Sequence, residues 1–461
     1  MSREKLVSVI LVAIFVTAIL PSCGSSSSSP QKSTLQSIAV SPGNAQLFLG
    51  TNQQLTATGN LSDGSTQDLT QAVTWSSSDS NVMLLNNSAG RAGVGNTRGP
   101  GTATISATNG TLTGTATVSV TRRTPAFLYA ANIATNSISG FTVNPASGVL
   151  APVSGSPFPT PTGDTCIAVD RDFKFLYAAD FGLNQVSAFS VNGNGSLSAL
   201  MGTPFPAGNG PVSVVTHPTA DFLYVSNQGS GEVTTYIIDP ELTQSSSVAI
   251  GNAPLFGTMT SDGTHFYQTV SALAQISVFS VDATNGSLTP VSGSPFSTGF
   301  FPRTIAIDPA GKFLYVTISS SFKGTSTSVY AYGIDAATGA LTAISGSPFS
   351  AGENPVSAAV DVSGRFLFVA NNANTANGNS VSAFSIDPGT GVLTAVPGSP
   401  FAASPFPLSV ATDPSGQYVY VGLDTSPGIA AFVMNQNTGA LTPIAGSPFP
   451  GSSVWSIATT Y

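Results

Sequence analysis

Residues 409–421, Ser-Val-Ala-Thr-Asp-Pro-Ser-Gly-Gln-Tyr-Val-Tyr-Val, hold the pattern that decides the fold of most of this chain. Two short apolar-rich runs flank the turn at 413–416, where proline fixes φ and glycine relieves the crowded position. A third run, Ile429 to Met434, and a fourth, Leu441 to Ile444, follow directly. The stretch therefore predicts four antiparallel strands in succession, which is one propeller blade.

The same order recurs along the chain, and two markers count the repeats. The first marker is an aromatic second strand, which begins at Phe127, Phe175, Phe222, His265, Phe313, Phe366 and Tyr418. The second marker is Gly-Ser-Pro-Phe, which begins at Gly155, Gly293, Gly346, Gly398 and Gly446, with a Gly-Thr-Pro-Phe variant at Gly202. One repeat, the shortest, lacks the second marker. A period of this length indicates a propeller with one blade per repeat.

The two ends of the repeat region predict how the ring closes. The first repeat begins directly at its second strand, Phe127, and the chain finishes with a first strand, Ser456 to Thr459, that has no successor. First and second strands match in number only if the C-terminal strand, residues 454–461, completes the N-terminal blade. Such an exchange removes the open edges of an unclosed array. The prediction is an all-β, seven-bladed β-propeller over residues 122–461.

A smaller all-β module precedes the propeller, over residues 35–121. Its runs alternate apolar and polar residues over five to seven positions around one central Trp, which is typical of a two-sheet sandwich. The stretches Trp75-Ser76-Ser77-Ser78 and Gly101-Thr102-Ala103-Thr104-Ile105 resemble the bacterial immunoglobulin-like group 2 (Big2) family. The resemblance implies an immunoglobulin-like fold and a role as a spacer, with an adhesive role as the alternative.

The N-terminus carries an export signal. Arg3 and Lys5 precede an apolar run from Leu6 to Leu20, which is short for a membrane span and right for a signal-peptide core. Leu20-Pro21-Ser22-Cys23 resembles the bacterial lipobox, which implies a signal peptide over residues 1–22 and diacylglycerol on Cys23. Residues 23–34 would then form a Ser-rich tether. We expect a lipid anchor in the bacterial cell envelope, at the outer membrane or cell surface; an uncleaved anchor helix is the alternative.

The composition excludes several partners. Lys and Arg number 13 against 21 Asp and Glu, for a net charge of −8, and no basic cluster exists to neutralise phosphates. Nucleic acid is therefore not an expected partner. Cysteine and histidine ligands at useful spacing are absent, so we expect neither a metal nor another cofactor. Apart from Cys23 the chain has one cysteine, Cys166, which we interpret as a small core residue. We expect a monomer.

The repeats themselves resemble a known family. The likeness is carried by two stretches, Phe-Leu-Tyr-Val-Ser-Asn at 222–227 and Phe-Leu-Phe-Val-Ala-Asn at 366–371. They are similar to repeats of the lactonase-like seven-bladed propellers, a family that includes 6-phosphogluconolactonase and a fungal muconate cycloisomerase, and of the related YVTN surface propellers. Propellers usually bind ligands at the channel mouth, on the face that carries the loops before the first strands and after the second strands. Fold likeness alone does not give an activity.

Residues of those loops are the candidate ligand-binding face. The residues that open the inner strands are Thr165, Val212, Leu255, Arg303, Val356, Leu408 and Trp455, and only Arg303 is charged. From these strand-opening residues, the adjacent loop positions and the loops after the second strands, we predict a ligand-binding site. Its candidate residues are Arg303, Trp455, Phe300, Phe301, Asp164, Glu232 and Glu353.

The catalytic pattern of the family is incomplete. The resemblance implies Pro-Arg-His at an inner strand start and a Glu after a second strand, but Pro302-Arg303-Thr304 lacks the His, and residues 316–319 lack the Glu. His217 and His265 map to the opposite face. The repeated aspartates before the second strands, Asp413 among them, we interpret as turn-capping groups. No catalytic residue is assigned.

Two hypotheses remain. The first is a non-enzymatic envelope lipoprotein whose propeller binds a protein, a glycan or a small molecule. The second is a secreted lactonase or cycloisomerase that acts on a small acidic lactone through Arg303. A lactonase needs a group that activates water beside a cation near the ester oxygen. It therefore predicts that Arg303 faces Glu353, Asp164 or Glu232 within hydrogen-bond reach.

Overall fold

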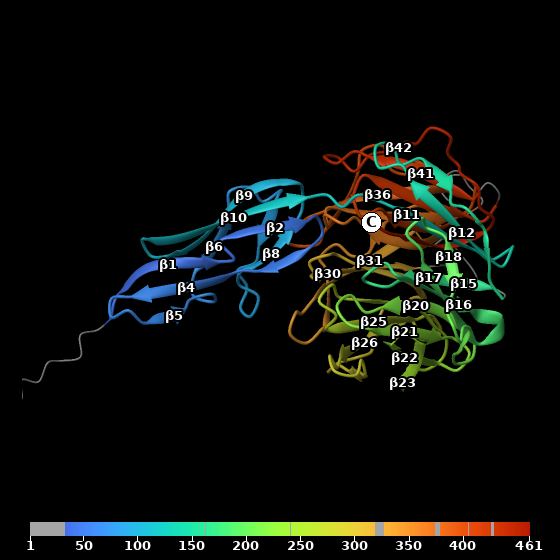
Figure 1. Ribbon diagram of the computed structural model, residues 1–461, viewed down its shortest axis with the longest axis horizontal. Coiled ribbons are helices and arrows are strands. Elements are labelled where there is room, and N and C mark those ends of the chain that lie inside the picture. Colours follow the sequence, from blue (N-terminus) through green and yellow to red (C-terminus); the bar gives the residue numbers. More distant parts are fainter. Residues whose placement is uncertain are drawn as a thin grey trace, which may run out of the picture.

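The computed structural model describes residues 33–161, 163–239, 241–318, 327–373, 379–403, 405–425 and 428–461. The chain forms an N-terminal sandwich and a larger, ring-shaped domain beside it (Figure 1). The predicted fold class, a seven-bladed β-propeller preceded by an immunoglobulin-like sandwich, is confirmed. The predicted signal peptide and the lipidated Cys23 lie outside the described residues.

The sandwich is built from ten strands in three sheets. The first sheet contains β1 (Leu35–Ser41), β4 (Thr56–Leu61) and β5 (Thr66–Asp68). The second contains β2 (Asn44–Phe48), β10 (Leu112–Thr121), β9 (Gly101–Asn109) and β6 (Thr74–Ser77). The third contains β3 (Asn52–Gln54), β8 (Val94–Thr97) and β7 (Met83–Leu85).

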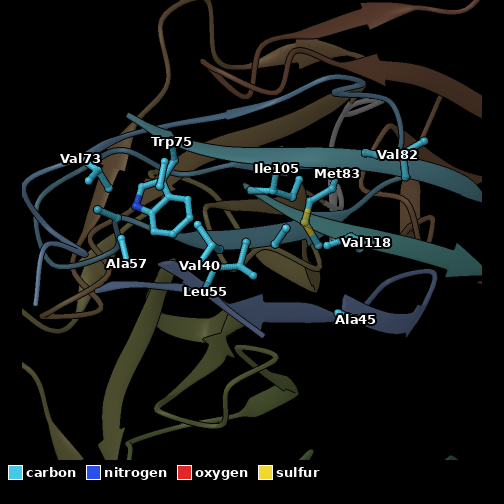
Figure 2. Packing of buried hydrophobic residues seen from close by; sticks show 14 of the residues in the cluster. Val40, Ala45, Leu55, Ala57, Val73, Trp75, Val82, Met83, Ile105 and Val118 are labelled. Carbon is cyan, nitrogen blue, oxygen red and sulfur yellow. The ribbon is translucent and has the colours of Figure 1, made fainter. Parts of the chain in front are cut away.

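The core of the sandwich forms around Trp75, as its central place in the sequence pattern suggests. Trp75 is only 2% exposed and lies in one apolar cluster with Leu55, Ile105 and Met83 (Figure 2). Its indole Nε1 donates to the carbonyl of Thr70 at 3.0 Å, so the buried polar atom is satisfied. Alternating side chains of the strands fill this space because successive residues of a strand point to opposite faces.

The propeller blades are numbered here by the order of their second strands, and each is given from the channel outward. Blade 1 contains β43 (Val454–Thr459), β11 (Phe127–Asn132), β12 (Ser137–Val143) and β13 (Leu150–Pro152). Blade 2 contains β15 (Asp164–Val169), β16 (Phe175–Asp180), β17 (Gln185–Val191) and β18 (Leu197–Ala199). Blade 3 contains β20 (Pro211–Thr216), β21 (Phe222–Asn227), β22 (Glu232–Asp239) and β23 (Glu241–Ala249). Blade 4 contains β24 (Pro254–Met259), β25 (His265–Val270), β26 (Gln275–Val281) and β27 (Leu288–Pro290).

The last three blades repeat this order. Blade 5 contains β29 (Pro302–Ile307), β30 (Phe313–Ile318), β31 (Ser328–Ile334) and β32 (Leu341–Ala343). Blade 6 contains β34 (Pro355–Val360), β35 (Phe366–Asn372), β36 (Asn379–Ile386) and β37 (Leu393–Ala395). Blade 7 contains β39 (Pro407–Thr412), β40 (Tyr418–Leu423), β41 (Ile429–Met434) and β42 (Leu441–Pro443). The chain ends in the innermost strand of blade 1, because β43 pairs antiparallel with β11, with Tyr129 opposite Ala458.

The Gly-Ser-Pro-Phe marker returns the chain to the third strand of its blade. Two-residue strands follow it and pair with that third strand: β14 (Phe158–Pro159), β19 (Phe205–Pro206), β28 (Phe296–Ser297), β33 (Phe349–Ser350) and β38 (Phe401–Ala402). The serine hydroxyl of the marker accepts a backbone N–H of the third strand, as Ser156 does from Gly140 at 2.9 Å. Blade 3, which lacks the marker, extends β22 and β23 into a long hairpin instead.

The repeated turn aspartates cap their turns, as predicted. Asp413 Oδ1 accepts the backbone N–H groups of Gln417 and Tyr418 at 2.8 and 2.7 Å, and Asp170, Asp308 and Asp361 make the equivalent bonds. In blade 3 His217 takes this role, because its Nδ1 accepts the N–H of Ala220 at 2.9 Å. These groups are structural.

Neighbouring blades are joined by the tyrosines of the second strands. The buried hydroxyl of Tyr129 in blade 1 donates to the carbonyl of Gly195 in blade 2 at 2.9 Å. The same bond runs from Tyr224, Tyr267, Tyr315 and Tyr420 to a glycine of the next blade. Tyr177 is the exception: its hydroxyl is buried with no partner among the described residues, because it faces blade 3, where the long hairpin replaces the glycine turn.

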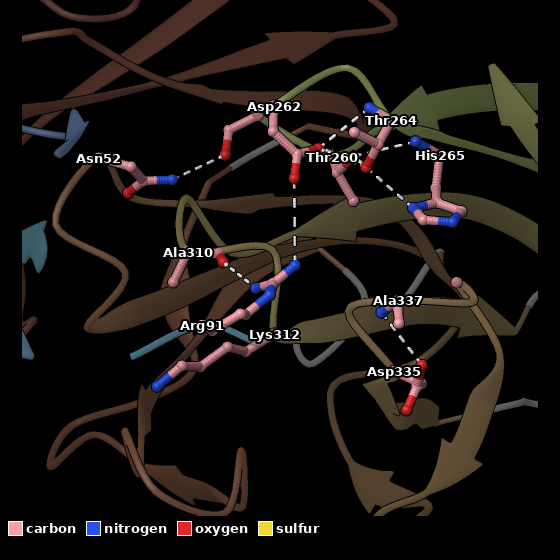
Figure 3. Close-up of polar contacts among 12 residues, drawn as sticks. Asn52, Arg91, Thr260, Asp262, Thr264, His265, Ala310, Lys312, Asp335 and Ala337 are labelled. Atoms are coloured by element: carbon pink, nitrogen blue, oxygen red, sulfur yellow. Dashed lines mark hydrogen bonds and ion pairs between the residues drawn. The ribbon is translucent and has the colours of Figure 1, made fainter. Parts of the chain in front are cut away.

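The sandwich is docked against one end of the ring. Asn52 Nδ2 donates to Ser261 Oγ and to the carbonyl of Pro309, both at 3.0 Å. Arg91 reaches the carbonyl of Ala310 at 3.2 Å and Asp262 at 4.0 Å (Figure 3). Arg122 donates to the carbonyl of Ser415 at 2.6 Å. The acceptors belong to turns between first and second strands, so the sandwich occupies that end of the propeller.

Candidate functional site

A cavity of about 440 Å³ opens at the other end of the channel. Its walls come from the starts of first strands and from the segments after second strands, which meet at one end because these strands run antiparallel. The lining residues are Ile133, Phe181, Val212, Gln228, Leu255, Phe256, Ser271, Phe301, Arg303 and Trp455. The volume falls in the range of ~300–1,000 Å³ that is common for small-molecule sites. The cavity is bounded by blades 1 to 5.

A recurrent bulge aims the lining side chains. In blades 3, 4 and 5 the first strand starts with a proline, and the pairing with the second strand shifts register immediately after it. The residue after the proline is Val212, Leu255 or Arg303, and each lines the cavity. Bulges at strand ends commonly redirect a side chain in this way. Thr269 Oγ1 in blade 4 donates to the carbonyl of Arg303 at 2.9 Å, which holds the bulge of blade 5 in place.

Arg303 is the charged group of this lining, and it has no counter-ion within the described parts of the chain. Burial alone lowers the pKa of its guanidinium below the usual value. An arginine nevertheless stays protonated in proteins. The described lining thus holds one partly desolvated positive charge among mostly apolar walls.

Three of the seven predicted site residues line the cavity: Arg303, Trp455 and Phe301. Phe300 is 59% exposed beside it and is not part of the lining. The backbone of Asp164 lies at the start of β15, opposite Asp180, and its side chain lies outside the described part of the structure.

The two predicted glutamates make other contacts and are not among the residues that line this cavity. The carboxylate of Glu232 accepts the hydroxyls of Ser230, at 3.0 Å, and of Ser247, within the outer hairpin of blade 3. Glu353 lines a different depression, of about 260 Å³, together with Gly352 and Ser382. Both residues lie at the cavity end of their blades. Glu232, however, contacts an outer hairpin, and Glu353 lines a depression of blades 5 and 6 away from the channel.

Thr304 stands where the family resemblance implies a catalytic histidine, and its side chain makes structural contacts. Thr304 Oγ1 and Thr317 Oγ1 lie 2.9 Å apart, and the backbone N–H of Thr304 donates to Thr317 Oγ1 at 3.1 Å. Neither a carboxylate nor an imidazole lines the cavity within the described residues. The described lining therefore offers a cation but no general base.

Several lining residues were not predicted. Phe181 begins the short 3-10 helix η1 (Phe181–Leu183) and Ser271 begins η2 (Ser271–Leu273), each directly after a second strand. Gln228 and Ile133 also follow second strands. The sequence signal that could have identified these four residues is their position directly after the aromatic second strand of a blade. Lys323, which follows β30 in blade 5, lies outside the described residues.

The histidines and the thiol lie away from this cavity. His217 Nε2 contacts the carbonyl of Gly263 at 3.1 Å, and burial lowers the pKa of this imidazole. His265 lies near the sandwich in the junction shown in Figure 3. Burial raises the pKa of the Cys166 thiol, which packs in the apolar cluster of blades 2 and 3.

The described residues contain neither a metal-ligand cluster nor a membrane-spanning helix. No group of three or more His, Cys, Asp or Glu side chains that could hold a metal ion occurs among them. Across the same residues, no helix is long and apolar enough to cross a membrane.

Family models match both domains. The model of the lactonase seven-bladed β-propeller matches residues 165–356 and 344–456, and the model of the group 2 bacterial Ig-like domain matches residues 34–121. Ice-binding protein 1 of Shewanella frigidimarina is 47% identical over 88 residues, which are 19% of this chain and 9% of that protein. The chain therefore spans about a tenth of this relative, and the likeness concerns one domain.

Solved structures resemble the propeller. A candidate 6-phosphogluconolactonase of Bacteroides fragilis superposes with a TM-score of 0.63 at 20% identity, over 73% of this chain and 98% of that chain. The periplasmic gluconolactonase of Pseudomonas aeruginosa gives a TM-score of 0.59 at 16% identity, over 73% of this chain and 99% of that one. At these identities the likeness shows the fold.

Proposed function

Because the chain belongs to the lactonase family of seven-bladed β-propellers, we propose that its function lies at the channel mouth, where it binds a small organic anion without turning it over. The observation that carries this proposal is Arg303, a desolvated cation without a counter-ion among the described residues, inside a cavity of small-molecule size. A half-buried charge without a counter-ion has lost part of its hydration, and a bound ligand of opposite charge can compensate that loss. An anion supplies that compensation.

The lining argues for binding over hydrolysis. A lactonase needs a base to activate water, and a carboxylate or imidazole commonly takes this role. The described lining contains only Gln228, Ser271 and Trp455 as polar side chains besides Arg303. None of these is a good general base at neutral pH. Among the described lining residues, the site supplies recognition of charge without a proton acceptor.

We place this binding module in the cell envelope. The lipobox-like stretch at Cys23 supports a lipid anchor, and the Ser-rich segment after it supports a flexible tether. Since the sandwich follows the tether and is docked at the opposite end of the ring from the cavity, Arg303 would face away from the membrane. Mass spectrometry of the purified chain should find an N-terminus at residue 23 that carries diacylglycerol, whereas a chain that still begins at residue 1 would indicate the uncleaved anchor helix.

Calorimetric titration of the purified full chain tests the binding function. Benzoate is expected to bind, and neutral benzamide, of the same shape, to bind at least about tenfold more weakly, because a hydrogen bond to a charged group contributes that much. Arg303→Met should remove the difference between the two compounds. Arg171→Met is the matched control, since Arg171 pairs with Asp221 away from the cavity. Equal affinities of the wild-type protein for benzoate and benzamide would reject the proposal.

The family match favours a second candidate, a lactonase that acts on a small acidic lactone. Glucono-δ-lactone hydrolysis, followed by pH-stat, distinguishes the two. We expect no turnover above the uncatalysed rate. Turnover that Arg303→Met abolishes would replace the binding proposal with the enzymatic one.

A further inference from the structure

The mouth of the cavity carries a concentration of exposed apolar side chains. Ten large hydrophobic residues of the described chain are exposed, and five of them belong to loops at this end of the ring: Phe181, Leu183, Leu273, Phe300 and Phe301. We call these five residues the apolar rim. Two of them, Phe181 and Phe301, also line the cavity, so the rim continues directly into the site. Exposed apolar clusters of this kind mark binding sites.

The rim is held by local structure. Phe181 and Leu183 belong to η1, and Leu273 ends η2, two short 3-10 helices that follow the second strands of blades 2 and 4. Phe181 lies over Gly210, where an added Cβ would meet its ring at 3.1 Å, and Leu273 lies over Gly251 in the same manner at 3.2 Å. The two glycines leave room for the apolar side chains next to the channel opening. The rim is therefore a built feature of the loops around the mouth.

From the cavity and the rim together we infer that the ligand is an amphipathic monocarboxylate, with its carboxylate on Arg303 and an apolar body that extends to the rim; this inference rests on the proposed function. A guanidinium pairs with a carboxylate through two parallel hydrogen bonds. The described lining holds one cation, which balances one negative charge. A dianion such as a phosphate ester would have a second charge with no partner among the described lining residues.

The same lining disfavours a sugar acid. Each hydroxyl of a sugar needs a hydrogen-bond partner when it leaves water, and the uncharged polar side chains of the lining are Gln228, Ser271 and the indole of Trp455. Val212, Leu255, Phe256 and Ile133 offer contact to carbon. A water molecule takes about 30 Å³ of liquid volume, so the cavity of about 440 Å³ has room for on the order of a dozen groups of that size. An aryl or acyl chain acid of that size fits.

Titration with four compounds tests the ligand class on the purified full chain: 4-phenylbutyrate, butyrate, 4-phenylbutyramide and gluconate. We expect 4-phenylbutyrate to bind at least about tenfold more tightly than butyrate, with a negative heat-capacity change from apolar burial. The amide should lose affinity about tenfold or more, and gluconate should not bind. Phe301→Ser should weaken 4-phenylbutyrate about tenfold and leave butyrate unchanged, whereas Met201→Ala, a change at a site 83% exposed outside the rim, should alter neither.

The outcomes separate the two proposals. If butyrate and gluconate bind as tightly as 4-phenylbutyrate and all depend on Arg303, anion binding stands and the ligand class is wrong. If no carboxylate binds, both are wrong. Phe301→Leu, which keeps an apolar side chain, should retain most of the affinity and shows whether a loss in Phe301→Ser comes from lost contact or from misfolding. Equal weakening of both acids in Phe301→Ser would also overturn the inference.

Discussion

Replacing Arg303 by methionine should make the protein more stable while it abolishes anion binding. Methionine keeps most of the length of the side chain and removes the charge. The guanidinium is desolvated and has no counter-ion among the described residues. A structural arginine is held by acceptors that its removal leaves unpaired, whereas a ligand-binding arginine is tolerated at a cost to stability. The sign of the change therefore distinguishes the two roles.

The expected increase in the free energy of unfolding of Arg303→Met follows from the surroundings of the Arg303 side chain. Replacing buried ionic groups by apolar residues of similar volume stabilises proteins by about 1–4 kcal/mol. Since Arg303 is partly exposed to the open cavity, we expect the low end of this range, about 1 kcal/mol. In a domain of this length the melting temperature would rise by roughly 1–3 °C.

Differential scanning calorimetry of both proteins measures this change, with equilibrium unfolding in urea for the free energy. Arg122→Met is the matched control. Its guanidinium donates to the carbonyl of Ser415 at 2.6 Å and to Gln436 Oε1 at 2.5 Å, so this substitution should destabilise the protein by about 1–3 kcal/mol. A loss of stability in Arg303→Met comparable to that in Arg122→Met would refute the reasoning and assign Arg303 a structural role.

Three other predictions concern the fold. Deleting Ser456 to Tyr461 removes most of β43 from blade 1, and we expect loss of the cooperative unfolding transition or aggregation; an unchanged melting curve would contradict closure by this strand. Tyr129→Phe should lower the free energy of unfolding by about 1 kcal/mol, because it leaves the carbonyl of Gly195 without its donor. Tyr177→Phe should be neutral or stabilising, since that hydroxyl has no partner in the described chain. Urea unfolding compares the two variants, and equal losses would argue against the inter-blade bond. Burial lowers the pKa of His217 in the folded protein, so the unfolded chain takes up its proton first as the pH falls. The stability that neutral His217 contributes is thus fully present above about pH 6.5, the unfolded pKa, and declines below it. His217→Asp, which introduces the turn residue of other blades, should flatten the decline below about pH 6.5 in thermal unfolding, and an unaltered slope would show that other groups cause it.

The ring and its closure were predictable because their signals are local and repeated. The turn at 413–416 and the aromatic second strand each encode a strand pair within a dozen residues, and the repeats place these pairs in register around the ring. The unmatched first strand at the C-terminus then determined the partner of Phe127. His217 has the same structural role as the turn aspartates, because it occupies their position in the repeat.

The site was predictable only in part, because strand order gives the end of the blade and not the distance from the channel. Arg303 and Trp455 open first strands, which are innermost, so their place in the cavity follows from the repeat. Glu232 opens a third strand, and the long hairpin of blade 3 carries it outward to Ser247. Glu353 precedes a first strand, yet its loop turns toward the outer part of blades 5 and 6. Loop paths depend on packing against neighbouring blades, which the repeat does not encode.

Most of the described basic side chains lie where the sandwich meets the propeller. Only 7% of the chain is charged, yet six of the nine described lysines and arginines are gathered where the two domains meet: Arg91, Arg98, Arg122, Arg123, Lys312 and Arg365. Arg123 is stacked between Phe48 of the sandwich and Tyr461, the last residue of the chain, with its guanidinium 4.7 and 3.6 Å from the ring centroids. The docked sandwich therefore also holds the end of the strand that closes the ring. One end of the propeller is thus covered by the N-terminal domain, whereas the end that carries Arg303 and the apolar rim is left open by it.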